Sequence, residues 1–269
     1  MSRLPDDLFA RTDGPRFAPS GARGLQLLGR TVEVLWLPER SRRRGVPKPD
    51  RPPFHDDAAP TIVAREAVWH GGDLAVTPNR YPFANRQLVL WSTRPIREPD
   101  EEMLAAALAF TSATGATALM NSIGAAASIP RAHLHLVDER LPFLPGLPTV
   151  AVTADWTGTA AARVARVPPP FPTCLLAIRG APAARARALH RLLLLRTATA
   201  FNAVDDGDTA WLMPRSPTEL TAPWFPQALG AAELWGRWCF LDEAPFRRAD
   251  ADGLLAALTL AGIADRGAG

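Results

Sequence analysis

The sequence has few of the residues that mark a disulfide-stapled, zinc-binding or membrane-spanning protein. Its two cysteines, Cys174 and Cys239, lie far apart in the chain. A disulfide framework or a CxxC zinc site needs more cysteines at closer spacing, so both are excluded and two buried thiols are expected. No apolar run reaches the roughly 18 to 20 residues that cross a bilayer, so no membrane span is expected.

The sequence also lacks a large net charge and a signal peptide. Lysine and arginine total 30 and aspartate and glutamate total 27, which leaves +3 on 269 residues when histidines are neutral. So weak a field argues against a protein whose affinity for nucleic acid rests on many phosphate contacts. Residues 1–7 lack the charged and apolar regions of a signal peptide. We therefore expect a cytoplasmic protein that binds neither nucleic acid nor membrane.

The composition is that of an ordinary folded protein. Hydrophobic residues make up 47% of the sequence and charged residues 21%, which is not the composition of a disordered chain. The length fits one large domain or two modules of about 100 to 150 residues, with ample core in either case.

Apolar patterns along the chain predict an α+β fold made of two similar series of elements. The first series is expected to hold strands at 31–37, 61–65, 73–77, 87–91, 117–121 and 131–137, and a helix from Pro99 to Thr114 that Gly115 ends. The second is expected to hold strands at 149–153, 174–178 and 209–213, an apolar segment at 232–240, and helices at 182–201 and 250–262. A short helix near 4–11 and a long irregular connection at 38–60 complete the prediction.

The similar order of the two series indicates a duplicated α+β unit. We expect an N-terminal extension at 1–30, a first half at 31–148 and a second half at 149–269. The identity between the halves is too low to establish a repeat from the sequence.

Residues 121–137 are the segment that carries chemistry. Side chains alternate between the two faces of a strand, so a strand over 131–137 would place Arg131, His133 and His135 on one face. The loop before it, 124–130, consists mostly of small residues, whose backbone N–H groups can approach an anion closely. Ser128 adds a hydroxyl. A phosphate lying over His133 would meet donors from the loop, from Ser128 and from Arg131.

The residues alone leave three interpretations of this histidine pair open. A neutral imidazole could attack phosphorus and form a nucleotidyl-histidine. The two histidines could instead bind a metal ion, or they could be strand histidines with no special role. The metal interpretation is the weaker one because no third ligand is evident; the other histidines are His55, His70 and His190.

The motif Ser128-x-Pro130-Arg131-x-His133-x-His135 resembles the active-site strand of the histidine triad superfamily. The most similar branch contains galactose-1-phosphate uridylyltransferase, diadenosine tetraphosphate phosphorylase and GDP-L-galactose phosphorylase. That branch carries His-x-His-x-Gln, and the triad hydrolases carry His-x-His-x-His. Alignment on Ser128 and Pro130 places the nucleophilic second histidine at His133 and the third position at His135. An alignment shifted by two residues, with His135 as nucleophile, breaks the Ser-to-His spacing.

The first triad position is Arg131, where the family has histidine. In the uridylyltransferases that histidine can bind a structural metal together with cysteines near the N-terminus. Residues 51–55 resemble that N-terminal region but lack its cysteines. The resemblance therefore implies that this chain has no metal site and needs no cofactor.

Further segments resemble the same branch in the same order and extend the resemblance over about residues 30–245. They are 38–40, 78–83, 201–204, 211–216 and 230–236. The resemblance implies roles in substrate binding for Asn79 and Arg80 beside the nucleoside, Asn121 at the ribose, Arg131 as a phosphate clamp or a partner of a carboxylate, Arg215 at the incoming phosphate and Glu233 at a substrate hydroxyl.

The resemblance implies a histidine-triad-like α+β fold in which two tandem halves form a pseudo-dimer around antiparallel sheets. The first half would be catalytic, and the second half would be degenerate because it lacks a His-x-His motif. The implied activity is nucleotidyl transfer from a nucleoside diphosphate sugar or dinucleoside polyphosphate to phosphate or a sugar 1-phosphate. A phosphorylase is slightly favoured, and a monomer is plausible. A catalytically silent nucleotide-binding protein and a nucleotide hydrolase are the alternatives.

Overall fold

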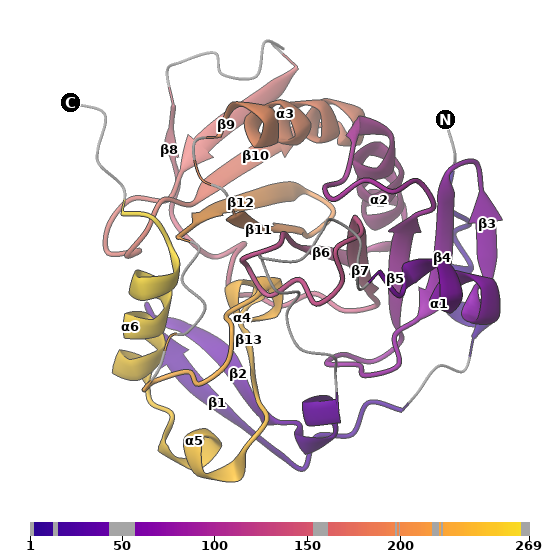
Figure 1. Ribbon diagram of the computed structural model, residues 1–269. Helices are drawn as coiled ribbons and strands as arrows, with labels where there is room; N and C mark the ends of the chain where they lie inside the picture. The colour runs from indigo at the N-terminus through magenta and orange to yellow at the C-terminus, as the bar shows by residue number, and fades with distance from the viewer. Residues whose placement is uncertain are drawn as a thin grey trace.

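The computed structural model describes residues 3–12, 16–42, 57–152, 161–196, 198, 200–216, 221 and 223–264. Within this part of the chain, two sheets and several helices form the mixed α+β architecture that the sequence predicts (Figure 1). The smaller sheet has the order β1 (Gly21–Leu27), β2 (Arg30–Trp36) and β13 (Arg237–Phe240). The larger sheet has the order β3 (Trp69–Gly71), β4 (Leu74–Pro78), β5 (Gln87–Ser92), β7 (His133–Val137), β6 (Thr117–Asn121), β11 (Ala200–Asp205), β12 (Thr209–Arg215), β10 (Leu176–Gly180), β9 (Ala162–Arg166) and β8 (Val150–Ala151).

The larger sheet repeats one strand order on the two sides of the β6–β11 pair. On one side three antiparallel strands, β3 to β5, are followed by a helix and the hairpin β6–β7, whose second strand pairs with β5. On the other side β8 to β10 are followed by a helix and the hairpin β11–β12, whose second strand pairs with β10. At the seam Asn121 of β6 pairs with Asn202 of β11. The topology therefore repeats even though the sequence does not.

The two connecting helices, α2 (Glu101–Thr114) and α3 (Pro182–Leu195), lie side by side over one face of this sheet (Figure 1). The carboxylate of Asp100 accepts a hydrogen bond from the backbone N–H of Met103 at 2.9 Å, which begins α2. Gly115 ends it with a φ of +78°, a conformation that glycine adopts without steric cost. Of the helices in the described residues, none combines the length and the apolar character that a membrane span requires.

The opposite face of the large sheet is covered by two different structures. The smaller sheet, α4 (Ala231–Trp235) and α6 (Ala251–Ala261) pack over its centre and over the half that begins at β11. There Leu119 and Trp211 share a core with Trp235. Near β4 and β5 the cover is α1 (Ala59–Glu66), which packs on Val89 and Trp91. This second region leaves space between α1 and the sheet, and the candidate site lies there.

Several elements differ from the sequence prediction. Residues 61–65, predicted as a strand, belong to helix α1. Pro60 stands in its first turn, and Ile62 and Val63 pack on the sheet instead of joining it. The predicted strand 131–137 begins at His133, and the predicted helix 182–201 ends at Leu195. Elements that were not predicted are β1, β3, β9, β11 and α5 (Glu243–Arg248). Short 3-10 helices occupy Leu8–Arg11 and Pro38–Arg42, and residues 43–56 of the predicted connection lie outside the described part.

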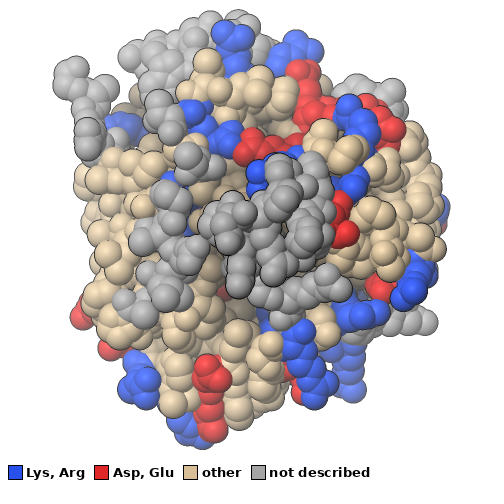
Figure 2. All heavy atoms as spheres, in the orientation of Figure 1, with Lys and Arg blue, Asp and Glu red and all other residues tan. Residues whose placement is uncertain are grey.

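Charged side chains of both signs are interspersed on the face of the molecule in Figure 2. Among the described residues of that face, basic side chains do not gather into one broad patch. This distribution matches the small net charge of +3.

Candidate active site

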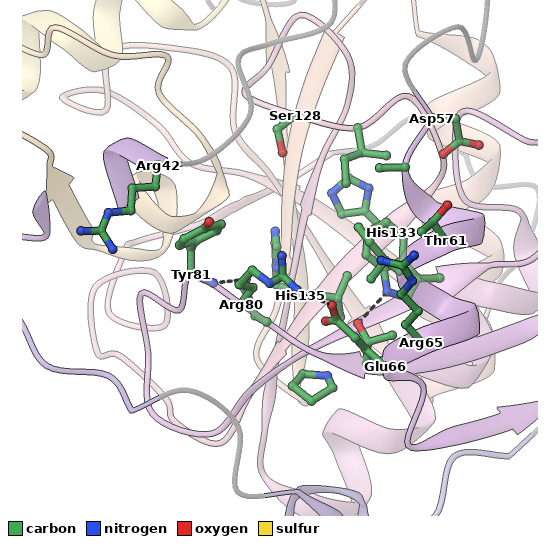
Figure 3. A pocket seen from close by; sticks show the side chains of 18 of the residues that line it. Arg42, Asp57, Thr61, Arg65, Glu66, Arg80, Tyr81, Ser128, His133 and His135 are labelled. Atoms are coloured by element: carbon green, nitrogen blue, oxygen red, sulfur yellow. Dashed lines mark hydrogen bonds and ion pairs between the residues drawn. The ribbon is translucent and has the colours of Figure 1, made fainter. Parts of the chain in front are cut away.

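A pocket of about 590 Å³ lies between α1, the large sheet and the segment 78–81 (Figure 3). This volume lies within the range that small-molecule sites occupy. Its polar lining includes Arg40, Arg42, Asp57, Thr61, Arg65, Glu66, Thr77, Asn79, Arg80, Tyr81, Ser128, His133 and His135. Of the sequence-predicted residues, the pocket brings together both histidines, Ser128, Asn79 and Arg80.

The His133 ring is held in one orientation. Its Nδ1 lies 2.7 Å from the backbone carbonyl of Arg131. A carbonyl oxygen only accepts hydrogen bonds, so Nδ1 carries the proton and, in the neutral ring, Nε2 carries the lone pair. The Trp91 ring lies 5.0 Å away at an interplanar angle of 32°, and its own Nε1 donates to Oγ1 of Thr77 at 2.9 Å. Strand pairing places Trp91 directly opposite His133. The arrangement presents a buried, oriented imidazole to the pocket.

His135 lies two residues further along β7, on the same face of the sheet. It stands opposite Val89 in the register of β5. Its ring centroid is 5.6 Å from that of His133, and the two rings are perpendicular at 89°. The Phe83 ring makes a T-shaped contact with it, with 5.6 Å between centroids and an interplanar angle of 73°. Both histidines therefore face the same pocket from one strand, as the alternation rule predicts.

Arg131 does not project with the two histidines, because it lies before the first residue of β7. Its Nε and Nη2 donate to Oδ2 of Asp57, at 2.8 and 2.7 Å, and its Nη1 donates to the carbonyl of Thr93 at 2.7 Å. It is not among the residues that line the pocket. Of the two roles considered for Arg131, the structure has the one in which it partners a carboxylate.

The pocket carries more positive than negative charge. Four guanidinium groups line it against the carboxylates of Asp57 and Glu66. The Glu66 carboxylate forms an ion pair with Arg80 at 2.8 Å. The Arg40 guanidinium is buried: it donates to the carbonyl of Tyr81 and lies over the Phe83 ring, and burial lowers its pKa. Such a lining attracts polyanions.

Asn79 and Ser128 lie on two turns at the edge of the pocket. Oδ1 of Asn79 accepts from the backbone N–H of Tyr81 at 3.0 Å and closes an Asx turn, which fixes the direction of the segment that carries Arg80. Ser128 stands on the small-residue loop, in which Gly124 and Ala126 have φ values of +83° and +72°. Both side chains reach the pocket from outside the strands.

Two other predicted residues belong to a buried network at the seam of the large sheet, outside the pocket. Oδ1 of Asn121 accepts from Nδ2 of Asn202 and from the backbone N–H of Ala231, each at 2.7 Å. Arg215 donates to Oδ1 of Asn202 and to the backbone carbonyls of Leu229 and Ala261. Burial lowers the pKa of Arg215 to about 10. In this structure these side chains join parts of the chain to each other.

Glu233 is also engaged inside the protein. Its Oε2 accepts from the backbone N–H of Gly230 at 2.7 Å, and its Oε1 accepts from the backbone N–H of Cys239 at 3.3 Å. Burial raises its pKa, against the pull of these hydrogen bonds and of Arg40. It does not line the pocket. Its contacts fix the start of α4 relative to β13.

Sequence analysis missed the wall of the pocket opposite the histidines. Asp57 and the α1 residues Thr61, Arg65 and Glu66 come from a region predicted as loop and strand. Trp91 was also missed, although pairing the predicted strands 87–91 and 131–137 would have placed it beside a histidine.

The described residues contain no group of three or more histidine, cysteine, aspartate or glutamate side chains that could hold a metal ion. Cys174 is half-buried and Cys239 is buried. Residues 51–55, which resemble a metal-binding region, lie outside the described part of the chain.

Comparison with known proteins places the fold. No family model matches the sequence, and no curated protein matches it. Among solved structures, yeast Ap4A phosphorylase Apa2 in complex with Ap4A is similar with a TM-score of 0.64 and 13% identity, over 91% of this chain and 90% of that one. A further structure of the same enzyme gives a TM-score of 0.63 over 98% of this chain and 94% of that one. An ADP-glucose phosphorylase from Arabidopsis thaliana is a weaker match, with a TM-score of 0.42 and 12% identity over 90% and 98%. The chain therefore shares the fold of yeast Ap4A phosphorylase over about nine-tenths of its length.

Proposed function

We propose that this chain, which has the histidine triad fold, is a nucleotidyltransferase of the phosphorylase type that works through a nucleotidyl-His133 intermediate. The observation that carries the proposal is the hydrogen bond from Nδ1 of His133 to the carbonyl of Arg131. It leaves the lone pair of the neutral ring on Nε2, in a pocket rich in arginine. A neutral, oriented nitrogen of this kind is the nucleophile that attack on phosphorus requires.

The reaction has two displacements at one phosphorus atom. In the first, Nε2 of His133 attacks the α-phosphorus of the donor, an N–P bond forms, and the P–O bond to the leaving group breaks with its electron pair. In the second, an oxygen of orthophosphate or a sugar 1-phosphate attacks the same phosphorus, and the N–P bond breaks to restore the lone pair. Ser128, His135 and the backbone N–H groups of loop 124–130 are the proposed donors to the nonbridging oxygens.

The proposed donor is a nucleoside diphosphate sugar or a dinucleoside polyphosphate. The pocket volume of about 590 Å³ has room for a nucleotide. Arg65 and Arg80 supply positive charge beside the histidines, and Asn79 shapes the turn proposed to lie at the nucleoside. The likeness to yeast Ap4A phosphorylase, whose structures hold Ap4A and AMP, supports a substrate of this class.

We also propose that the two halves form a pseudo-dimer with a single active site. The repeated strand order on the two sides of the β6–β11 pair supports it. The second half has no His-x-His motif, so the nucleophile belongs to the first half. One chain then supplies the whole site, which fits a monomer, and the sequence-based expectation of a cytoplasmic protein stays part of the proposal.

Intact-protein mass spectrometry tests the intermediate. The protein is incubated with a panel of nucleoside diphosphate sugars and diadenosine polyphosphates, beside His133→Ala and His135→Ala. We expect an acid-labile adduct of one nucleoside monophosphate. This adduct should be absent in His133→Ala, and addition of phosphate should discharge it from the natural chain. In His135→Ala the adduct should form more slowly but still form, because this ring contributes donors and not the nucleophile.

Each other outcome points to a different function. Loss of the adduct in His135→Ala alone would make His135 the nucleophile. Discharge of the adduct by water at the same rate with and without phosphate would indicate a hydrolase. Binding of nucleotides without any adduct would indicate a catalytically silent nucleotide-binding protein.

A further inference from the structure

A buried ion pair joins Asp57, at the wall of the pocket, to Arg131, two residues before His133. Arg131 donates two hydrogen bonds to one carboxylate oxygen of Asp57, at 2.8 and 2.7 Å. The two side chains are 9% and 5% exposed. A pair this far removed from water is held in a narrow range of geometries, because each charge depends on the other for its solvation.

Both partners are also attached to the elements on either side of the pocket. The carbonyl of Arg131 accepts from Nδ1 of His133 at 2.7 Å. Oδ1 of Asp57 accepts from the backbone N–H of Ala59, the first residue of α1, at 3.0 Å. The ion pair therefore joins the residue that holds the imidazole to the helix that forms the opposite wall.

We propose that the Asp57–Arg131 pair is a positioning device for His133. It fixes the peptide whose carbonyl holds Nδ1, and so determines that Nε2 is the nitrogen presented to the pocket. The inference rests on the proposed function only in that it takes Nε2 as the nucleophile, since the tautomer is a property of the protein alone. Asp57 and Arg131 act through His133 and are positioning residues.

The geometry explains why the residue is arginine. In its guanidinium group, Nε and Nη2 donate to Asp57, and Nη1 donates to the carbonyl of Thr93, 2.7 Å away. One planar group thus spans two partners. A lysine at this position carries the same charge on one nitrogen and cannot span both. The orientation of His133 that is lost in Arg131→Gln should therefore be kept in part, and not in full, in Arg131→Lys.

The first readout is the tautomer of His133, measured by long-range ¹H–¹⁵N correlation spectra of the full chain labelled at histidine. The His133 signals are assigned by their loss in His133→Ala. We expect the Nδ1–H tautomer in the natural chain and a mixture of tautomers in Asp57→Asn and in Arg131→Gln. The double variant Asp57→Asn/Arg131→Gln leaves no buried charge unpaired and keeps the test open if a single variant does not fold.

The second readout is the rate at which the nucleotidyl adduct forms. We expect the maximal rate to fall by about 100-fold in each variant, the cost of a nucleophile displaced by about 1 Å, with little change in the donor concentration at half-saturation. The double variant should be no slower than the single variants, because the pair acts as one unit. Asp205→Asn is the matched control: it breaks an equally buried pair with Arg185, 3% and 3% exposed, that does not line the pocket.

An unchanged His133 tautomer in the double variant would overturn the proposal. The proposal would also be overturned if the adduct formed more slowly only because the donor bound more weakly. The pair would then serve to hold α1 in place and not to orient His133. If the tautomer changes as expected while no donor labels the natural chain, the proposed function fails and the positioning role stands.

Discussion

At the scale of single residues, Asp205 is a buried carboxyl group whose proton affinity links stability to pH. It accepts from Arg185, Thr111 and the backbone N–H of Gly207 between α2, α3 and the sheet. Burial raises its pKa from 3.8 to about 6, even though Arg185 favours the charged form. Between these two pH values the folded state holds a proton that the unfolded chain has released. The contribution of Asp205 to the free energy of unfolding is therefore largest below about pH 4 and is lost as the pH rises through 6.

Comparison with Asp205→Asn isolates this contribution, because asparagine does not titrate. We expect the stability of the natural chain relative to the variant to fall by about 2 kcal/mol between pH 4.5 and pH 7.5. Urea unfolding of both proteins at the two pH values measures it. A difference that is the same at both pH values would mean that the carboxyl group does not change its protonation in this range.

The sequence predicted the side chains that a strand and its adjoining loop control. His133, His135 and Ser128 could be placed together because alternation along a strand is local. Arg131 was assigned to the same face because the strand was drawn two residues too long. Its partner Asp57 is 74 residues away in the chain, and no local pattern reports a contact at that distance.

At the scale of elements, α1 supplies a wall that carries both signs of charge. Glu66 holds Arg80 at 2.8 Å, and both line the pocket. An anionic substrate competes with Glu66 for the Arg80 guanidinium. We predict opposite effects of two substitutions: Glu66→Gln should tighten binding of a nucleoside diphosphate roughly 2- to 5-fold, and Arg80→Gln should weaken it by a similar factor, as expected for exposed charges worth up to about 1 kcal/mol.

Isothermal titration at low and moderate salt measures these affinities, and the two effects should shrink as salt rises. Arg11→Gln removes another partly exposed arginine of an ion pair, with Asp7, that does not line the pocket, so it controls for a general change in charge. Equal effects of Arg80→Gln and Arg11→Gln would mean that Arg80 does not face the bound anion.

Elements with strong boundary signals were the ones predicted well. The acids after Pro99 and the glycine at 115 mark both ends of α2, and its observed range is Glu101–Thr114. Helix α1 was mistaken for a strand because Thr61, Ile62 and Val63 are β-branched, a preference that packing against Val89 and Trp91 overrides. Strand β1 was missed because apolar and polar residues alternate only weakly along its sequence. Its strand conformation comes from pairing with β2, which its composition does not indicate.

At the scale of the whole molecule, the two series of elements are joined by strand pairing and helix packing that the sequence does not predict. Strand β13, near the end of the chain, pairs in parallel with β2 near its beginning. Helices α2 and α3, one from each series, pack against each other. The order of elements within each series follows from local patterns, whereas these joins depend on surfaces that exist only after each series has folded.

We predict that the molecule unfolds as one cooperative unit although its topology repeats. One core cluster contains Val34 and Leu119 from the first half and Trp211 and Trp238 from the second, so separation of the halves would expose it. Calorimetry should give one transition whose calorimetric and van't Hoff enthalpies agree. A fragment of residues 1–148 should lack cooperative unfolding alone and regain it when mixed with residues 149–269. Two transitions, or a cooperative transition of residues 1–148 alone, would show instead that the seam at β6 and β11 joins two independently stable halves.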